Sequence, residues 1–142
     1  MASVYGVNAT KAADPSPSNI LNPGTLGGKV RVMVDSYEAA ALAAASTITI
    51  GKALPVGAIV IGGKLSWDAL GAGVTLAVGD ATTADRYLAA TAAAAAGIAN
   101  LPDDVDGLSY VITGTADTVI KITTAVAAAT GTISIIILYV LE

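Results

Sequence analysis

The chain has 142 residues, the usual size of one domain, and 54% of them are hydrophobic while only 13% are charged. Globular chains carry about 25% charged residues, so this chain either crosses a membrane or has much of its surface covered by other protein. A spanning helix needs about 20 consecutive apolar residues. The best apolar run, 133–141, is far shorter and contains Ser134. We therefore expect no membrane partner and a surface covered by protein.

Most of the residue types that enzymes use are missing. Histidine and cysteine are absent, which excludes a serine–histidine–aspartate triad, thiol chemistry, and histidine or thiolate metal sites. Asp80, Asp106 and Asp117 lie beside Gly or Thr at predicted strand ends, where Asp is an ordinary turn residue. The net charge is -4 and the basic residues are scattered, so there is no basic stripe for nucleic acid. We expect no enzyme activity, no cofactor, no metal and no nucleic-acid binding.

Residues 1–28 predict an extended N-terminal arm. They contain Pro15, Pro17 and Pro23 among Ser, Asn and Gly, and proline continues neither a helix nor a central strand. The start of the chain lacks a basic segment followed by an apolar run, so we expect no signal peptide. Two interpretations stay open: a loose terminus, or an arm that becomes ordered against a neighbouring subunit through its apolar residues. Those residues are Val4, Tyr5, Ile20 and Leu21.

From residue 29 onward the sequence predicts β-strands separated by Gly and Asp. The runs are rich in Val, Ile, Thr and Tyr, which suit a pleated, half-buried surface. In the first run, Val30, Val32 and Val34 share one face. About eight strands at fairly regular spacing, with no long helical pattern between them, predict an all-β sandwich over 29–142. The runs are 29–35, 47–50, 58–63, 64–67, 74–80, 86–89, 109–113, 118–123 and 132–140.

Two alanine-rich runs, 37–45 and 89–96, are ambiguous. Alanine favours helices, so each run is consistent with a short helical turn or with a tightly packed strand or loop. The last predicted strand is different, because it has apolar residues on both faces, as in a strand buried on both sides. An exposed strand of that kind would be an aggregation site. We therefore expect it to be central in its sheet or to face another chain.

Several segments resemble small structural proteins encoded near the capsid genes of tailed phages. The resemblance rests on Lys64-Leu-Ser-Trp-Asp, Leu76-Ala-Val-Gly-Asp, Ala84-Asp-Arg-Tyr-Leu and Thr130-Gly-Thr-Ile-Ser-Ile, and it extends over residues 29–142. It implies a capsid decoration (cement) protein with a jelly-roll-like sandwich, made in the host cytoplasm. Such a protein forms a homotrimer on the exterior of the phage head and contacts the major capsid protein. The alternatives are a tail or head-fibre component and a module that binds carbohydrate or the host surface.

Residues of these segments are also candidates for protein contact. The segment 85–87 offers a carboxylate, a guanidinium and an aromatic ring, and the chain has only two arginines. We therefore expect Arg86 to have a specific partner, Asp68 or Asp80, the alternative being a solvated ion pair of little energetic value. Together with the arm, the predicted protein-contact residues are Val4, Tyr5, Ile20, Leu21, Trp67, Arg86 and Tyr87.

Overall fold

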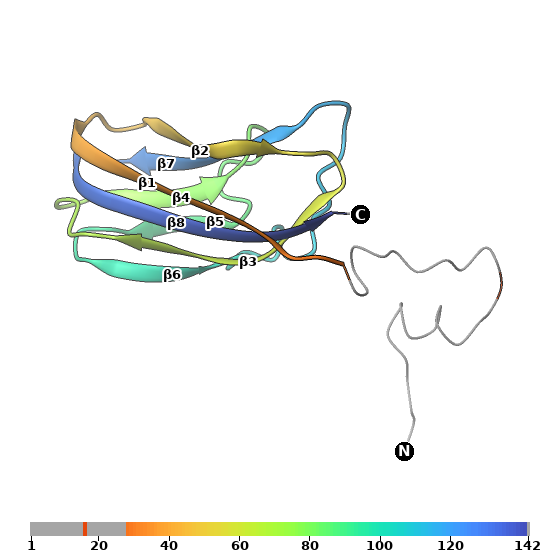
Figure 1. Cartoon of the computed structure of the whole chain (residues 1–142). Coiled ribbons are helices and arrows are strands. Elements are labelled where there is room, and N and C mark those ends of the chain that lie inside the picture. Colours follow the sequence, from red (N-terminus) through yellow and green to blue (C-terminus); the bar gives the residue numbers. More distant parts are fainter. Residues whose placement is uncertain (1–15, 17–27, 142) are drawn as a thin grey trace, which may run out of the picture.

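Two four-stranded antiparallel sheets pack face to face (Figure 1). The computed structural model describes residue 16 and residues 28–141. Sheet A has the strand order β1-β8-β3-β6 and sheet B the order β2-β7-β4-β5, so the predicted all-β sandwich is confirmed. The strands are β1 (Arg31–Leu42), β2 (Thr47–Leu54), β3 (Ala58–Trp67), β4 (Thr75–Gly79), β5 (Leu88–Ala92), β6 (Gly97–Leu101), β7 (Thr118–Ala125) and β8 (Ala129–Leu141).

The core lies between the sheets and is mainly aliphatic. Successive side chains of a strand point to opposite faces, so Ile133, Ile135 and Ile137 of β8 all point inward and are buried. Ile120 and Ile122 of β7 belong to the same core on the side of sheet B. Burying one such side chain stabilises the folded state by about 1.5–3 kcal/mol. The alternating burial therefore fixes which face of each strand points outward.

Strand β8 is central in sheet A, as its apolar sequence predicts. It pairs with β1 on one side and with β3 on the other, so its backbone groups are not left at an edge. Its inner face belongs to the core, but its outer face contains Ile136, which is 43% exposed. The described residues of this chain therefore bury only one face of β8.

Both alanine-rich runs continue strands and then turn. The first provides the end of β1 and the second most of β5, and no helix forms among residues 28–141. The strand predicted at 109–113 is wrong: only Val111 pairs, through an isolated bridge to Ile59. Ser109 and Gly114 both have positive φ, which breaks an extended run on either side of the bridge. The segment 97–101 forms β6 instead.

The two ends of the sandwich differ in chemistry. Four short turns, 43–46, 68–74, 93–96 and 126–128, lie at the end away from the C-terminus (Figure 1) and consist largely of Ala and Gly. The longer loops at the other end carry most of the acidic residues. The described part of the chain has no helix long and apolar enough to span a membrane. The arm predicted for residues 1–28 falls almost entirely outside the described residues and stays a prediction.

Candidate protein-contact surface

The outer face of sheet A has an apolar centre. Strand pairing places Val32 beside Leu138 and Val34 beside Ile136 on adjacent strands. Val32, Val34 and Ile136 are 62%, 66% and 43% exposed, because their strands turn the opposite side chains toward the core. These residues, Val32, Val34, Ile136 and Leu138, form what we call the apolar patch. Lys64 of β3 lies beside Ile136 at its margin.

Further along the same face the side chains become polar. Ser36 of β1, Ser134 of β8 and Ser66 of β3 are neighbours in the sheet. In the next row Thr132 donates from Oγ1 to Oε2 of Glu38 at 2.6 Å, and its backbone N–H donates to Oδ2 of Asp68 at 3.1 Å. The Asp68 N–H donates in turn to the carbonyl of Thr132 at 3.0 Å. Thr132 therefore fixes two exposed carboxylates at this end of the face.

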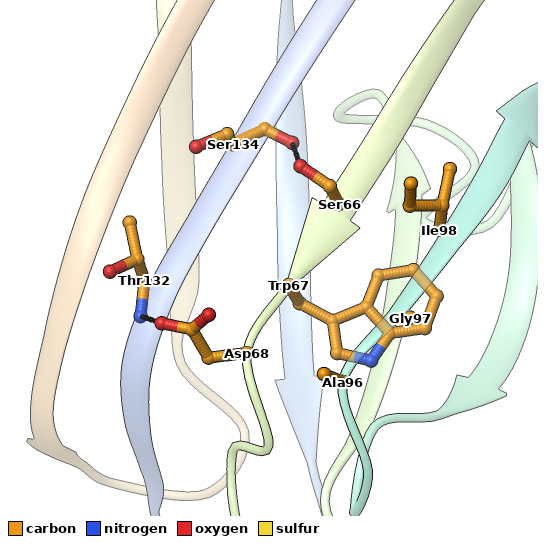
Figure 2. Close-up of a pocket in the computed structure, with 8 residues that line it drawn as sticks. All are labelled: Ser66, Trp67, Asp68, Ala96, Gly97, Ile98, Thr132 and Ser134. Carbon is orange, nitrogen blue, oxygen red and sulfur yellow. Dashed lines mark hydrogen bonds between the residues drawn. The ribbon is translucent and has the colours of Figure 1, made fainter.

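A shallow depression lies beside these carboxylates, and its centre is the contact of Trp67 with Gly97 (Figure 2). The indole Nε1–H donates to the carbonyl of Ala95 at 2.9 Å. A Cβ at position 97 would lie 2.6 Å from Cζ2 of Trp67, so only glycine lets the indole lie across β6. The depression is lined by Ser66, Trp67, Asp68, Ala96, Gly97, Ile98, Thr132 and Ser134.

The outer face of sheet B provides a contrast. Strand pairing places Thr47 beside Thr123, and Thr123 beside Ala77, while Thr49 lies beside Lys121. Within the described residues, every large hydrophobic side chain that is exposed on a strand belongs to sheet A. The two faces of the sandwich are thus chemically different, and the face of sheet A is the one suited to burial against another protein.

Arg86 has the specific partner that its sequence context predicts, and the partner is Asp80. Its Nε donates to Oδ2 of Asp80 at 2.6 Å, and its guanidinium lies 3.6 Å from the ring centroid of Tyr110, a cation–π geometry. Nη2 also donates to the hydroxyls of Thr82 and Thr83 at 3.0 and 2.9 Å. This cluster joins the β4–β5 loop to the 102–117 loop.

The pKa of Asp80 lies below its usual value. Burial by itself raises the pKa of this carboxyl, but hydrogen bonds from Thr82, Arg86 and Thr83 favour the charged form and outweigh that effect. Tyr87, next to Arg86, is 1% exposed and packs in the core. Burial and the nearby charge of Asp80 raise the pKa of its hydroxyl, which has no hydrogen-bond partner among the described residues.

The structure separates the predicted contact residues. Trp67 lines the depression on the face of sheet A, whereas Arg86 and Tyr87 lie in and beside the loop cluster at the other end of the sandwich. Val4, Tyr5, Ile20 and Leu21 are outside the described residues, so a contact role for all seven stays a prediction. Sequence reasoning missed Glu38, Thr132 and the outward direction of the apolar patch. It named Asp68 only as an alternative partner of Arg86, which the structure does not bear out, because Asp68 is bonded to Thr132 and Arg86 to Asp80. The alternation of Val30, Val32 and Val34 was the one available signal.

Among the comparisons with known proteins, the one with solved structures found similar chains. No family model matches the chain, and no curated protein matches it. A chain of the cyanophage Pam1 capsid is 34% identical with a TM-score of 0.67, over 82% of this chain and 88% of that chain. A chain of the Ralstonia phage GP4 capsid is 24% identical with a TM-score of 0.66, over 81% and 86% of the two chains.

A third structure, the acid-stable capsid of Helicobacter pylori bacteriophage KHP30, contains a chain that is 17% identical with a TM-score of 0.57, over 79% and 87%. The GP4 and KHP30 chains share the fold. The Pam1 similarity is stronger, because the sequence identity is higher at a similar coverage. The fold and this similarity define a structural protein of a phage virion. The chain belongs to the family of phage capsid proteins represented by the Pam1 chain.

Proposed function

We propose that the chain is a capsid decoration (cement) protein that binds the exterior of the phage head as a homotrimer. It stabilises the head through contacts with the major capsid protein and between its own copies. The observation that carries this proposal is the apolar patch on sheet A, which is exposed in a chain that belongs to a family of phage capsid proteins. Such a patch lowers the free energy of the assembled state when another protein covers it, by about 25 cal/mol per Å² of apolar area.

The size of the patch favours a multivalent arrangement. Association costs about 4–15 kcal/mol of translational and rotational freedom, and four aliphatic side chains that are only partly exposed offset little of this. One copy would therefore bind weakly. In a trimer the second and third contacts are intramolecular, which raises the overall affinity without any new contact. Binding to the assembled shell but not to its parts then stabilises the shell by mass action.

Two further observations support this proposal. The strand orders β1-β8-β3-β6 and β2-β7-β4-β5 interleave the two halves of the chain between the sheets, as in the double-sheet jelly rolls common in viral capsids. We also propose that the chain has no enzymatic activity, because histidine and cysteine are absent and acidic residues such as Asp80 have structural partners. Trp67 is only 8% exposed, which disfavours the carbohydrate-binding alternative, since little of its ring is available for stacking.

The experiment uses empty phage heads that lack the chain. Purified chain is added, and co-sedimentation and the temperature of head disruption are measured together with the native mass of the free chain. We expect saturable binding, a higher disruption temperature and a trimeric mass. A double variant, Val34→Ser with Ile136→Ser, should bind at least about tenfold more weakly, whereas Thr47→Ser with Thr123→Ser on sheet B should not. Absence of binding by the unaltered chain would overturn the proposal.

A further inference from the structure

We propose that the depression beside Asp68 receives a basic side chain, arginine or lysine, from the major capsid protein. This inference rests on the proposed function, because it specifies the chemistry of the surface that the outer face of sheet A meets. It goes beyond that function by assigning a polar anchoring site next to the apolar patch.

The charges at this site have no partner within the described residues. Asp68 and Glu38 each accept a hydrogen bond from Thr132, but the one ion pair of residues 28–141 joins Arg86 to Asp80 at the other end of the sandwich. The carboxylates are exposed and their remaining oxygens are free to accept further bonds. A cation brought to this end of the face would therefore meet two negative charges that nothing else in the described chain neutralises.

The hydrogen-bonding groups that line the depression are suited to a donor. The indole N–H of Trp67 is already bonded to Ala95, and the Ser66 hydroxyl donates toward the carbonyl of Ser134 at 3.5 Å. The charged acceptor that remains available is Asp68, and beside it the serine hydroxyls can also accept (Figure 2). Arginine and lysine carry only donors, so they match this lining, whereas an acidic side chain would be repelled.

The shape of the depression also fits these side chains. Ala96 and Gly97 leave room above β6, and Ile98, which is 68% exposed, forms an apolar wall beside the indole of Trp67. Arginine and lysine have long aliphatic stems that pack on apolar surface while their charged ends reach polar groups. The stem would lie along Ile98 and Gly97, and the charged end would meet Asp68.

The position of the site defines what the partner must present. Ile136 of the apolar patch and Thr132, whose N–H binds Asp68, are four residues apart on β8, so the patch and Asp68 are separated by about 13 Å along the strand. The partner surface therefore combines an apolar group with a basic side chain at that spacing. Lys64 lies beside the apolar patch and does not line the depression, so it does not occupy the site of its own chain. A basic residue of a second copy is the competing source of the cation.

The first test uses Trp67, the one tryptophan of the chain, as a fluorescent reporter. N-acetyl-arginine amide is titrated at constant ionic strength, with the neutral citrulline analogue as the matched ligand. We expect a saturable change in emission with the arginine compound alone. Asp68→Asn keeps an acceptor oxygen for Thr132 but removes the charge, and it should weaken binding about two- to fivefold. Equal responses to both ligands, or an unaffected Asp68→Asn variant, would overturn the inference.

The second test measures binding of the same variant to empty heads at low and high salt. Asp68→Asn should bind more weakly than the unaltered chain and show a smaller salt dependence, whereas Asp104→Asn in the distant loop should behave normally. If the unaltered chain binds and Asp68→Asn binds equally well, this inference fails while the proposed function stands. If the unaltered chain does not bind, the proposed function fails. Loss of self-association in Asp68→Asn would assign the site to a second copy and overturn the choice of partner.

Discussion

The carboxylate of Asp80 organises the loop between β4 and β5. Its Oδ1 accepts hydrogen bonds from the N–H groups of Thr82 and Thr83, both at 2.8 Å, while Oδ2 accepts from Arg86. We predict that Asp80→Asn lowers the free energy of unfolding by about 2 kcal/mol at pH 7, because Arg86 loses its charged partner. Urea unfolding measures this loss, with Asp85→Asn in the same loop as the control.

The same substitution should change how stability depends on pH. The pKa of Asp80 is lower in the folded protein than the ordinary value of an aspartate, so the folded state binds fewer protons than the unfolded state below about pH 4. The stabilisation is complete above the unfolded pKa and is lost as the pH falls through the folded pKa. Asp80→Asn should therefore lose less stability between pH 5 and pH 3 than the unaltered chain, and parallel pH curves would contradict the assignment.

For the hydroxyl of Tyr87 we predict the opposite effect, a gain in stability when it is removed. It is buried without a hydrogen-bond partner in the described structure, and a buried unsatisfied polar group costs about 1–3 kcal/mol. Tyr87→Phe removes the hydroxyl and keeps the ring in the core, so we expect the free energy of unfolding to rise by about 1 kcal/mol. Thermal and urea unfolding measure the change. A loss of stability would mean that a buried water or an undescribed residue bonds the hydroxyl.

The turn between β7 and β8 holds a valine in an unfavourable conformation. Val126 has a φ of 74° and is 75% exposed, and the N–H of Ala127 donates to the carbonyl of Ala125 at 3.0 Å, which closes a γ-turn. Such turns are strained for a β-branched residue. Val126→Gly should therefore raise the free energy of unfolding by about 1 kcal/mol. Val105→Gly, at an exposed valine without positive φ, should not, and equal effects of the two changes would contradict the strain argument.

The strands differ in how well sequence reasoning predicts them. Runs 47–50, 118–123 and 132–140 are rich in β-branched residues and fall in β2, β7 and β8, because such side chains favour a pleated, half-buried surface. The segment 97–101 contains one β-branched residue, Ile98, and gave no such signal. The alanine-rich runs were undetermined because alanine fits a helix, a strand or a turn, and tertiary pairing decides among them.

The candidate surface was harder to predict than the strands. A period of two places Val32 and Val34 on one face of β1, with Val30 just before the strand, but it does not say whether that face meets the core or the solvent. The depression depends on contacts between residues distant in sequence, such as Asp68 with Thr132 and Trp67 with Gly97. These contacts follow from the register of β8 and β6 on β3, which local patterns do not specify.

The described part of the chain is a sandwich with two unlike faces. Sheet B presents Thr, Ala and a lysine, whereas sheet A presents the apolar patch and two carboxylates that form no ion pair within residues 28–141. Protein surfaces normally intersperse charges among apolar groups, and a contiguous apolar area marks an interaction site. The high hydrophobic content of the chain, 54%, thus reflects more than its core. It includes a face that the capsid is proposed to cover.

Cysteine footprinting on assembled heads tests this central claim most directly, because the chain has no cysteine of its own. Val34→Cys places a thiol on the face of sheet A and Thr49→Cys places one on the face of sheet B, and both positions are exposed in the free chain. Each variant is treated with a maleimide, free and bound to empty heads. We predict that binding strongly slows labelling at position 34 and leaves position 49 reactive. Equal labelling at position 34 in the free and bound chains, or protection of position 49 alone, would contradict the claim.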